Sequence, residues 1–294
     1  MAAMMLLVIL FGYGVIFGSF INALVWRLHE QAVLVINRKR SQNQNQSQKQ
    51  TTNYKLQTTN YSIFRGRSMC PKCKHVLGVK DLVPVFSWLS LRGKCRYCKK
   101  PISIQYPLVE LLTGLLFTIF YLGWPFSLSG LHLVWFLYGL VYLVFFMALA
   151  VYDVKWFLLP DRLVFPLIAI AASQVVITSL RQQSLSELWL PVAGAGLFFG
   201  LFWGIYQLSA GKWIGGGDVK LAAALGLIVG GPLEAMMVLF VASLLGTMVS
   251  IPLLLQEKNG LHQHIPFGPY LLAGCLAVVL YGDRLTEWYT GLFL

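Results

Sequence analysis

The strongest constraint on the fold is a series of apolar segments, several of which reach or approach the roughly 20 residues that a membrane-spanning helix needs. Hydrophobic residues make up 57% of the 294-residue chain. The sixth segment is short and joins the seventh at Gly230-Gly231-Pro232. The pattern predicts an all-α integral membrane protein with about eight transmembrane helices. The segments span residues 4–26, 107–123, 131–151, 163–180, 188–209, 219–230, 232–255 and 267–282.

The first apolar segment is expected to be a helix of the mature protein rather than a cleaved signal peptide. It has no basic region at its start, and no small-residue cleavage site closes it. Instead it continues through Gly18-Ser19-Phe20-Ile21-Asn22 into Arg27.

The distribution of basic residues orients the helices. With eight spans and the N-terminus outside, all but two of the 23 lysines and arginines, Arg181 and Arg284, lie in inside loops, as the positive-inside rule expects. The same rule accounts for the net charge of +12 and argues against a nucleic-acid partner. The inside loops are residues 27–106, 152–162, 210–220 and 256–266.

The loop 27–106 is the only large piece outside the apolar segments, and its two halves differ in composition. Residues 41–60 are rich in Gln, Asn, Ser and Thr and hold almost no apolar side chains, so they predict a flexible insert. Residues 66–106 contain four of the five cysteines. We therefore divide the chain into a first transmembrane helix (1–26), this cytoplasmic loop, and a polytopic domain (107–294).

The four cysteines form two C-x-x-C pairs, Cys70 with Cys73 and Cys95 with Cys98. Four thiolates so spaced can surround Zn²⁺ tetrahedrally, and a domain of about 40 residues is too small to fold well without such a ligand. We expect a structural zinc site. Redox-active or free thiols are the alternative, although disulfides are disfavoured in a reducing compartment.

The remaining cysteine and two histidines have ordinary interpretations. Cys275 lies inside the last apolar segment and is expected to be a buried, inert thiol. His262 and His264 lie in an inside loop, where a solvated position or a contact with substrate is expected rather than a second metal site.

Two of the five aspartates stand at the edges of apolar segments. Asp153 closes the third segment, and Asp218 follows three glycines before the sixth. The predicted orientation places both at the cytoplasmic rim at similar depth. A carboxylate at the edge of a bilayer is a functional candidate, and two that meet can share a proton and activate water.

Each aspartate also has a structural interpretation. Asp153 can be a helix-flanking charge that pairs with Lys155, and Asp218 can be an N-cap or a first-turn carboxylate. The glycines before Asp218 favour the functional alternative, because glycine permits positive φ and the close approach of another backbone, as an extended peptide substrate requires. Asp161, after Pro160, is expected to be an ordinary N-cap.

These motifs, taken together and in this order, resemble the type IV prepilin leader peptidases, which are membrane aspartyl proteases and N-methyltransferases. The resemblance covers nearly the whole chain. The Gly-x-Gly-Asp element alone is only moderately specific, whereas the full set is highly specific. The chain departs from the family pattern in having Tyr152 before the first aspartate, and in its Gln/Asn-rich insert. The motifs are Gly18-Ser19-Phe20-Ile21-Asn22, the two cysteine pairs, Tyr106-Pro107-Leu108-Val109-Glu110, Asp153 with Leu159-Pro160-Asp161, Gly215-Gly216-Gly217-Asp218-Val219-Lys220 and Pro266-Phe267-Gly268-Pro269-Tyr270.

The resemblance implies that Asp153 and Asp218 are the catalytic pair in a bacterial inner-membrane protein with a periplasmic N-terminus. It implies type IV prepilins and type II secretion pseudopilins as substrates, cleaved after a short basic leader on the cytoplasmic side. It also implies methylation of the freed amino group with S-adenosylmethionine. No sequence feature locates that cofactor, since a strand followed by a glycine-rich turn is absent from the pattern.

We expect water to attack the scissile peptide between one ionised and one protonated aspartate. The helix termini favour a carboxylate at Asp218 and a protonated Asp153. One rival is a proton-coupled transporter that uses the same acids, which would place them near the bilayer midplane. The other is a zinc-stabilised scaffold without chemistry, in which both aspartates are replaceable.

Overall fold

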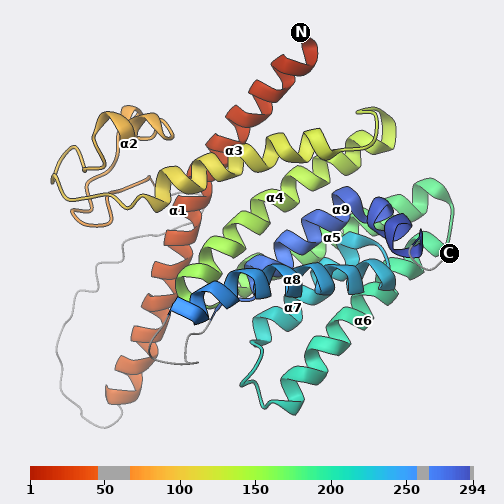
Figure 1. The fold of residues 1–294 in the computed structure, drawn as a ribbon. Helices are drawn as coiled ribbons and strands as arrows, with labels where there is room; N and C mark the ends of the chain where they lie inside the picture. The colour runs from red at the N-terminus through yellow and green to blue at the C-terminus, as the bar shows by residue number, and fades with distance from the viewer. Residues whose placement is uncertain (46–66, 257–264, 292–294) are drawn as a thin grey trace. The chain divides into compact units, whose positions relative to one another are not determined.

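A computed structural model describes residues 1–45, 67–256 and 265–291, which are predominantly helical and contain no β-strand beyond isolated bridges (Figure 1). The predicted all-α architecture is confirmed. Most of the Gln/Asn-rich tract, together with His262 and His264, lies outside the described residues. The helices are α1 (Ala2–Asn45), the 3₁₀ turn η1 (Val79–Asp81), α2 (Phe86–Ser90), α3 (Gln105–Gly123), α4 (Gly130–Trp156), α5 (Asp161–Gln182), α6 (Ser186–Leu208), α7 (Gly216–Val229), α8 (Pro232–Gln256) and α9 (Gly268–Gly291).

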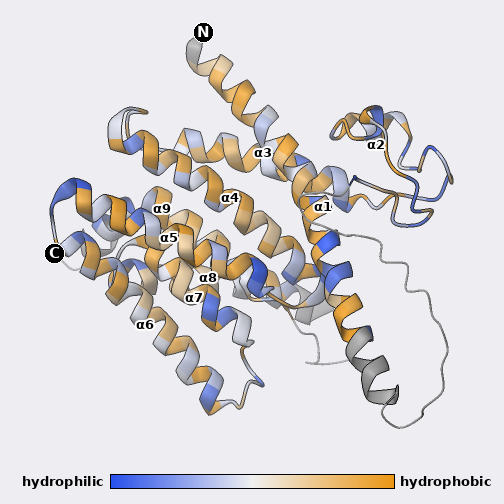
Figure 2. Cartoon of the chain, turned by 180° about the vertical axis from the view of Figure 1, so that it is seen from behind, coloured by the Kyte–Doolittle hydropathy of each residue, from blue (hydrophilic) through white to orange (hydrophobic). Residues whose placement is uncertain are grey.

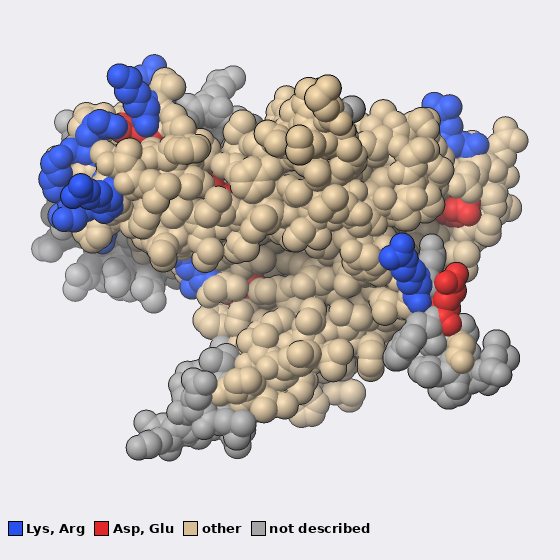
Figure 3. Space-filling view, turned by 45° about the horizontal axis from the view of Figure 1, so that its top comes forward, with Lys and Arg blue, Asp and Glu red and all other residues tan. Residues whose placement is uncertain are grey.

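Every predicted apolar segment is a helix, but not every helix is long and apolar enough to cross a membrane. Among the described residues six helices meet that requirement: α1, α3, α4, α5, α6 and α8. The 14-residue α7 does not, and α9 contributes only the shorter apolar stretch Gly268–Gly282. Apolar residues run along these helices in Figure 2, and most of the face in Figure 3 is free of charged side chains. The chain is a multi-pass membrane protein, and the count of eight spans stays a prediction.

Helix α1 is longer than its apolar pattern indicates. The apolar run ends near Trp26, whereas the helix continues to Asn45 and so includes the first residues of the polar tract. The sequence contains no glycine or proline between Ala23 and Asn45, so nothing in it interrupts the backbone hydrogen bonds. Hydropathy marks where a helix can enter lipid, but it does not mark where the helix ends.

The chain divides into two compact units, Met1–Leu116 and Phe117–Leu294. In the first unit α1 and α3 approach closely at glycines. A Cβ added to Gly14 would lie 2.7 Å from the Cα of Gly114, and one added to Gly18 would lie 2.6 Å from the Cα of Glu110. Small residues of this kind let two helix backbones meet without a side chain between them.

In the second unit α7 lies among α5, α6, α8 and α9. Six of its residues are buried, and Leu221, Ala222 and Leu225 are fully so. A Cβ added to Gly226 would lie 2.5 Å from the Cα of Ala195 on α6. A helix enclosed by protein on several sides need not span the bilayer, which explains why α7 can be short and can begin with the residue pattern Gly-Gly-Asp.

The packing of α7 against α6 predicts opposite effects for two Gly→Ala substitutions. Gly226→Ala should force the two backbones apart and destabilise the protein by about 1–3 kcal/mol or more. Gly200→Ala on α6 is the matched control, because a Cβ there meets no atom within 4 Å. It should be neutral or stabilise the helix by up to ~1 kcal/mol. Thermal unfolding of the two variants in detergent measures the difference.

Candidate functional site

Asp153 is a buried carboxylate in the last turn of α4. The residue is 6% exposed. The helix ends three residues later, where Phe157 adopts a left-handed conformation (φ 55°) and its N–H donates to the Asp153 carbonyl at 2.7 Å. The side-chain Oδ2 accepts a hydrogen bond of 3.2 Å from the N–H of Gly268, the first residue of α9. The start of α9 is therefore directed at this carboxylate.

Asp218 lies in the first turn of α7, preceded by the N-cap Gly215. Its side chain is partly buried, and the carboxyl groups of Asp153 and Asp218 are close enough for the charge of one to act on the other. Two aspartates that are 65 positions apart in the sequence thus lie near each other in the structure. Free N–H groups in the first turn of a helix favour negative charge nearby.

Leu159 fills the space between the starts of α7 and α9. A Cβ on Gly217 would lie 2.8 Å from the Cβ of Leu159. A Cβ on Gly268 would lie 3.7 Å from its Cδ2 and 2.5 Å from Oδ2 of Asp153. None of the three glycines before Asp218 has a positive φ. Glycine at these positions therefore lets neighbouring groups approach the backbone closely. It does not supply the left-handed conformation that the sequence also allowed.

Two of the structural interpretations are not supported. Lys155 places its Nζ 4.9 Å over the ring of Trp156 and forms no ion pair with Asp153 in the described structure. The interpretation of Asp161 as an N-cap is wrong: the cap is Pro160, and Asp161 is the first helical residue, without a capping bond. Its carboxylate instead forms an exposed ion pair of 2.7 Å with Lys220, which links α5 to α7.

The two cysteine pairs form matching turns in the first unit. In the first turn the Cys70 N–H donates to the His75 carbonyl and the Lys74 N–H donates back to the Cys70 carbonyl, both at 2.9 Å. Lys74 has φ 59°. The second turn repeats these bonds between Cys95, Lys99 and Lys100 at 2.9 and 3.0 Å. Such a turn directs two thiols toward one point.

The four sulfur atoms lie within 4.8 Å of one another, with Cys70 and Cys98 at 4.0 Å. Tetrahedral Zn²⁺ with Zn–S bonds of about 2.3 Å would hold its sulfurs roughly 3.8 Å apart, so the site fits a metal after a slight contraction. Burial raises the pKa of the Cys95 thiol, but the N–H groups of Cys98 and Tyr97 outweigh it and lower the pKa to about 7. The Cys73 thiol shifts the other way: the His75 N–H acts to lower its pKa, but desolvation and the neighbouring Cys70 and Cys98 sulfurs outweigh it and raise the pKa to about 11. Cys95 is therefore the thiol best placed to bind a metal ion as a thiolate.

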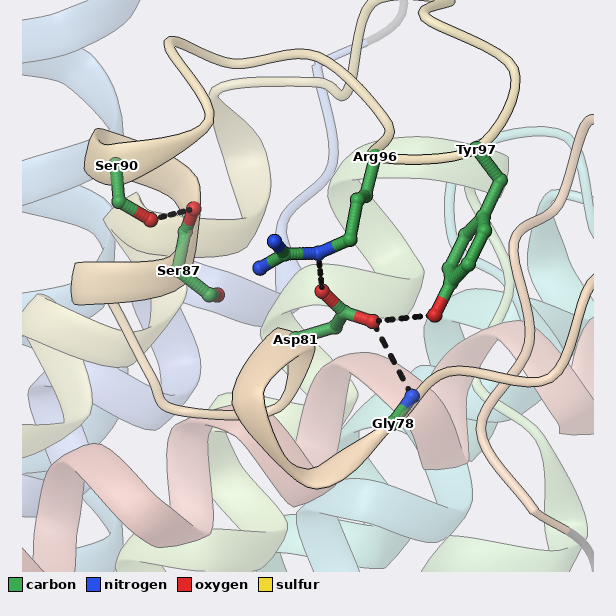
Figure 4. A network of polar contacts seen from close by, with 6 residues as sticks. All are labelled: Gly78, Asp81, Ser87, Ser90, Arg96 and Tyr97. Atoms are coloured by element: carbon green, nitrogen blue, oxygen red, sulfur yellow. Dashed lines mark hydrogen bonds and ion pairs between the residues drawn. The ribbon is translucent and has the colours of Figure 1, made fainter.

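A carboxylate ties the loop before α2 to the second cysteine turn (Figure 4). Asp81 accepts hydrogen bonds from Arg96 Nε at 2.7 Å, Tyr97 Oη at 3.2 Å and the Gly78 N–H at 3.2 Å. Burial acts to raise the pKa of Asp81, but these three donors hold it below the usual value. The module is therefore held by polar contacts as well as by its cysteines.

The described fold defines a class: a polytopic membrane protein with a four-cysteine module and two neighbouring aspartates at helix ends. The chain belongs to the type IV leader peptidase family. The family model for that peptidase matches residues 140–251, and the model for the bacterial peptidase A24 N-terminal domain matches residues 13–124.

Similar proteins match over most of their length. The prepilin leader peptidase/N-methyltransferase of Aeromonas salmonicida is 32% identical over 97% of this chain and 94% of its own. The protein of the same name from Aeromonas hydrophila is 34% identical over the same shares. The Bacillus subtilis protein is 31% identical over 78% of this chain and 87% of its own. No solved structure matches the chain significantly.

The site contains contacts that the sequence did not reveal. In the sequence, Gly268 and Leu159 belong to motifs, but nothing predicted which residues they contact. The sequence did hold one signal for these contacts. The motifs that contain Leu159 and Gly268 lie at the ends of predicted helices on the same membrane face as Asp153 and Asp218, so they could be expected to lie close together.

The cysteine geometry predicts about one divalent metal ion per chain in protein purified without chelator, measured by elemental analysis. Cys95→Ser should lose the metal. Cys275→Ser should retain it, because Cys275 is a buried residue of α9, outside the cysteine cluster. Metal binding requires thiolates, so protons compete with it: the ion should stay bound near pH 8 and be released as the pH falls toward about 5. Metal-free protein at neutral pH would contradict the site.

Proposed function

We propose that this protein cleaves the short basic leader from type IV prepilins and type II secretion pseudopilins, and then N-methylates the newly exposed N-terminal residue. Membership of the leader peptidase family and the names of the relatives support both activities. The observation that carries the proteolytic half is the meeting of Asp153 and Asp218 at the ends of α4 and α7.

The two aspartates would divide the work of peptide hydrolysis. One ionised carboxylate takes a proton from water, which attacks the scissile carbonyl carbon. The other, protonated, donates to the carbonyl oxygen and then to the leaving amine. Two interacting carboxyl groups titrate as a unit, and their mutual repulsion favours the singly protonated pair that this mechanism needs.

Helix ends do not assign the two roles. Asp218 lies in the first turn of α7, where N–H groups favour the carboxylate. Asp153 lies in the last turn of α4, but it accepts the N–H of Gly268 from the start of α9. Both carboxylates therefore receive stabilisation from a helix N-terminus, and the earlier inference that only Asp218 does so loses its basis.

We place the site at the cytoplasmic face of the bacterial inner membrane, with the N-terminus in the periplasm. The support is the charge distribution, in which nearly all basic residues fall in the predicted inside loops. The polytopic part, residues 107–294, would hold the peptidase. Its substrate would enter sideways, because a prepilin carries a hydrophobic helix directly after the leader. The transporter alternative requires acids near the bilayer midplane, whereas Asp153 and Asp218 both lie at helix ends.

The cofactors of the proposed function are Zn²⁺ and S-adenosylmethionine. The all-sulfur donor set and its spacing suit zinc at Cys70, Cys73, Cys95 and Cys98. S-adenosylmethionine would supply a methyl group that leaves its sulfonium sulfur for the lone pair of the amine, while the sulfur keeps the electron pair of the broken bond. We assign methylation and substrate presentation to the cysteine module, because the aspartates lie elsewhere in the chain.

Replacing either aspartate should abolish cleavage, while the variant still inserts into the membrane and unfolds at the wild-type temperature. Asp→Asn should fail as completely as Asp→Ala at positions 153 and 218, because an amide cannot exchange the proton. Each loss should exceed about tenfold, or roughly 1.4 kcal/mol of barrier. Leader removal from a purified prepilin in detergent is the measurement.

The matched control for the aspartate variants is Asp161→Asn. It removes a carboxylate at the same membrane face, but one that is 53% exposed and paired only with Lys220. Exposed ion pairs contribute little, so this variant should remain active. Substantial cleavage by Asp153→Asn or Asp218→Asn would exclude the aspartate pair.

The contact between Gly268 and Asp153 predicts a second loss of cleavage without removal of a carboxylate. Gly268→Ala places a methyl group 2.5 Å from Oδ2 of Asp153, so the carboxylate must move and lose its N–H donor. The cleavage rate should fall by about tenfold or more, since one hydrogen bond to a charged group contributes about 1.5–3 kcal/mol. Gly246→Ala, whose Cβ would lie 3.5 Å from the Tyr270 ring, should cleave normally. Equal rates for both variants would show that the contact does not position Asp153.

A further inference from the structure

The first unit contains an open cavity that the proposed peptidase chemistry does not use. It is lined by α1, by the cysteine module and by the start of α3, and all its lining residues belong to Met1–Leu116. Its free space is about 1000 Å³, including solvent at the mouth. Cofactor sites are clefts lined mostly by apolar side chains with a few placed polar groups, and this lining has both. We propose that this cavity binds S-adenosylmethionine, an inference that rests on the methyltransferase half of the proposed function.

Two sequence motifs without a role at the aspartates meet in this cavity. Ser19 and Asn22 come from the motif in α1, and Tyr106 and Glu110 come from the motif at the start of α3. The close approach of α1 to α3 at Gly18 brings them together, and Asn22 Nδ2 donates to the Tyr106 carbonyl at 3.0 Å. The same packing that joins the helices thus builds one wall of the cavity.

Asn22 offers an acceptor that the protein leaves unused. The residue is 4% exposed, and its Oδ1 is buried without a hydrogen-bond partner. A buried polar atom in that state costs about 1–3 kcal/mol. A ligand that brings an N–H donor would recover this free energy. S-adenosylmethionine carries two such donors, the exocyclic amine of adenine and the ammonium of the methionine part.

Two charged residues of the lining, Glu110 and Arg27, can face the opposite charges of S-adenosylmethionine, whereas the other two, Asp81 and Arg96, pair with each other. Glu110 is 6% exposed, and its hydrogen-bond donors are the Val85 N–H at 2.7 Å and the Ser19 side chain, neither of which is a cation. A buried carboxylate of this kind suits a sulfonium or an ammonium. Arg27, also in the lining, suits the ligand's carboxylate.

Two tryptophans supply flat surfaces for the remaining parts of the ligand. Trp26 and Trp88 both line the cavity, and the Nζ of Lys74 lies over the Trp26 ring, 5.1 Å from its centroid. Trp88 is fixed by a hydrogen bond of 3.2 Å from Nε1 to the Ile102 carbonyl, and its ring packs against Gly93, where a Cβ would lie 3.0 Å away. Indole rings stack on adenine and attract cations over their faces. Because Cys70 and Cys95 also line the cavity, metal binding would hold its shape.

Direct binding to full-length protein in detergent tests the assignment. Calorimetry should detect S-adenosylmethionine binding to the wild type. Asn22→Leu removes the acceptor together with the Nδ2 donor to the Tyr106 carbonyl, and Glu110→Gln removes the charge but keeps an oxygen for the Val85 N–H. Each should raise Kd by about tenfold or more, equivalent to roughly 1.4 kcal/mol. Ultraviolet crosslinking of labelled S-adenosylmethionine to the wild type should mark peptides that contain Trp26 or Trp88.

Matched substitutions away from the cavity control for general effects. Asn37→Leu makes the same change at an exposed position of α1, and Glu187→Gln removes a carboxylate from the first turn of α6. Both should bind S-adenosylmethionine like the wild type. Bound metal and thermal unfolding show whether the two cavity variants are folded, and the crosslink in the wild type gives an answer even if they are not.

The outcomes separate the two hypotheses. If the wild type methylates a prepilin but the cavity variants bind the cofactor within twofold of wild type, or the crosslink maps outside the lining, the cavity assignment is overturned and the proposed function stands. If the wild type cleaves a prepilin but neither binds S-adenosylmethionine nor transfers a methyl group, the methyltransferase half of the proposed function fails, and the cavity assignment fails with it.

Discussion

The hydrogen bond from the Gly268 N–H to the buried carboxylate of Asp153 joins the end of α4 to the start of α9. It requires a residue without a side chain at Gly268, and Leu159 must pack beside it. The same leucine packs against Gly217, so the start of α7 is fixed relative to both helices. The position of Asp218 beside Asp153 follows from this small set of contacts. A buried charge in such a place is tolerated because helix N-termini face it.

The remainder of the second unit supports this arrangement through the close packing of α7. Gly226 meets Ala195, and Gly194 meets Gly231, at distances that leave no room for a Cβ. With its buried face of alanines and leucines, α7 has neighbours on several sides. The carboxylate at its start is thus carried by an element that cannot easily shift, which is the condition for holding two acids in a productive geometry.

The sequence predicted the elements better than their contacts. Apolar runs located every long helix, since twenty apolar residues allow few other structures, and C-x-x-C spacing located the cysteine cluster. The limits of α1 were missed because hydropathy does not register helix propensity in polar residues. Asp161 was assigned to the wrong partner because an N-cap pattern is local, whereas Lys220 is distant in sequence. The convergence of Asn22 with Glu110 depends on glycine-mediated packing between α1 and α3, which no periodicity encodes.

The unbroken course of α1 has a consequence for the evolution of the loop that follows it. A helix of 44 residues is about 66 Å long, roughly twice the thickness of the bilayer's hydrocarbon core. The polar C-terminal part of the helix therefore exceeds the length that a hydrocarbon core can hold. An insertion or deletion in the loop after Asn45 enters the chain far along the helix from its apolar part. A lineage can therefore lengthen this loop and alter its composition while the groups close to the membrane keep their places.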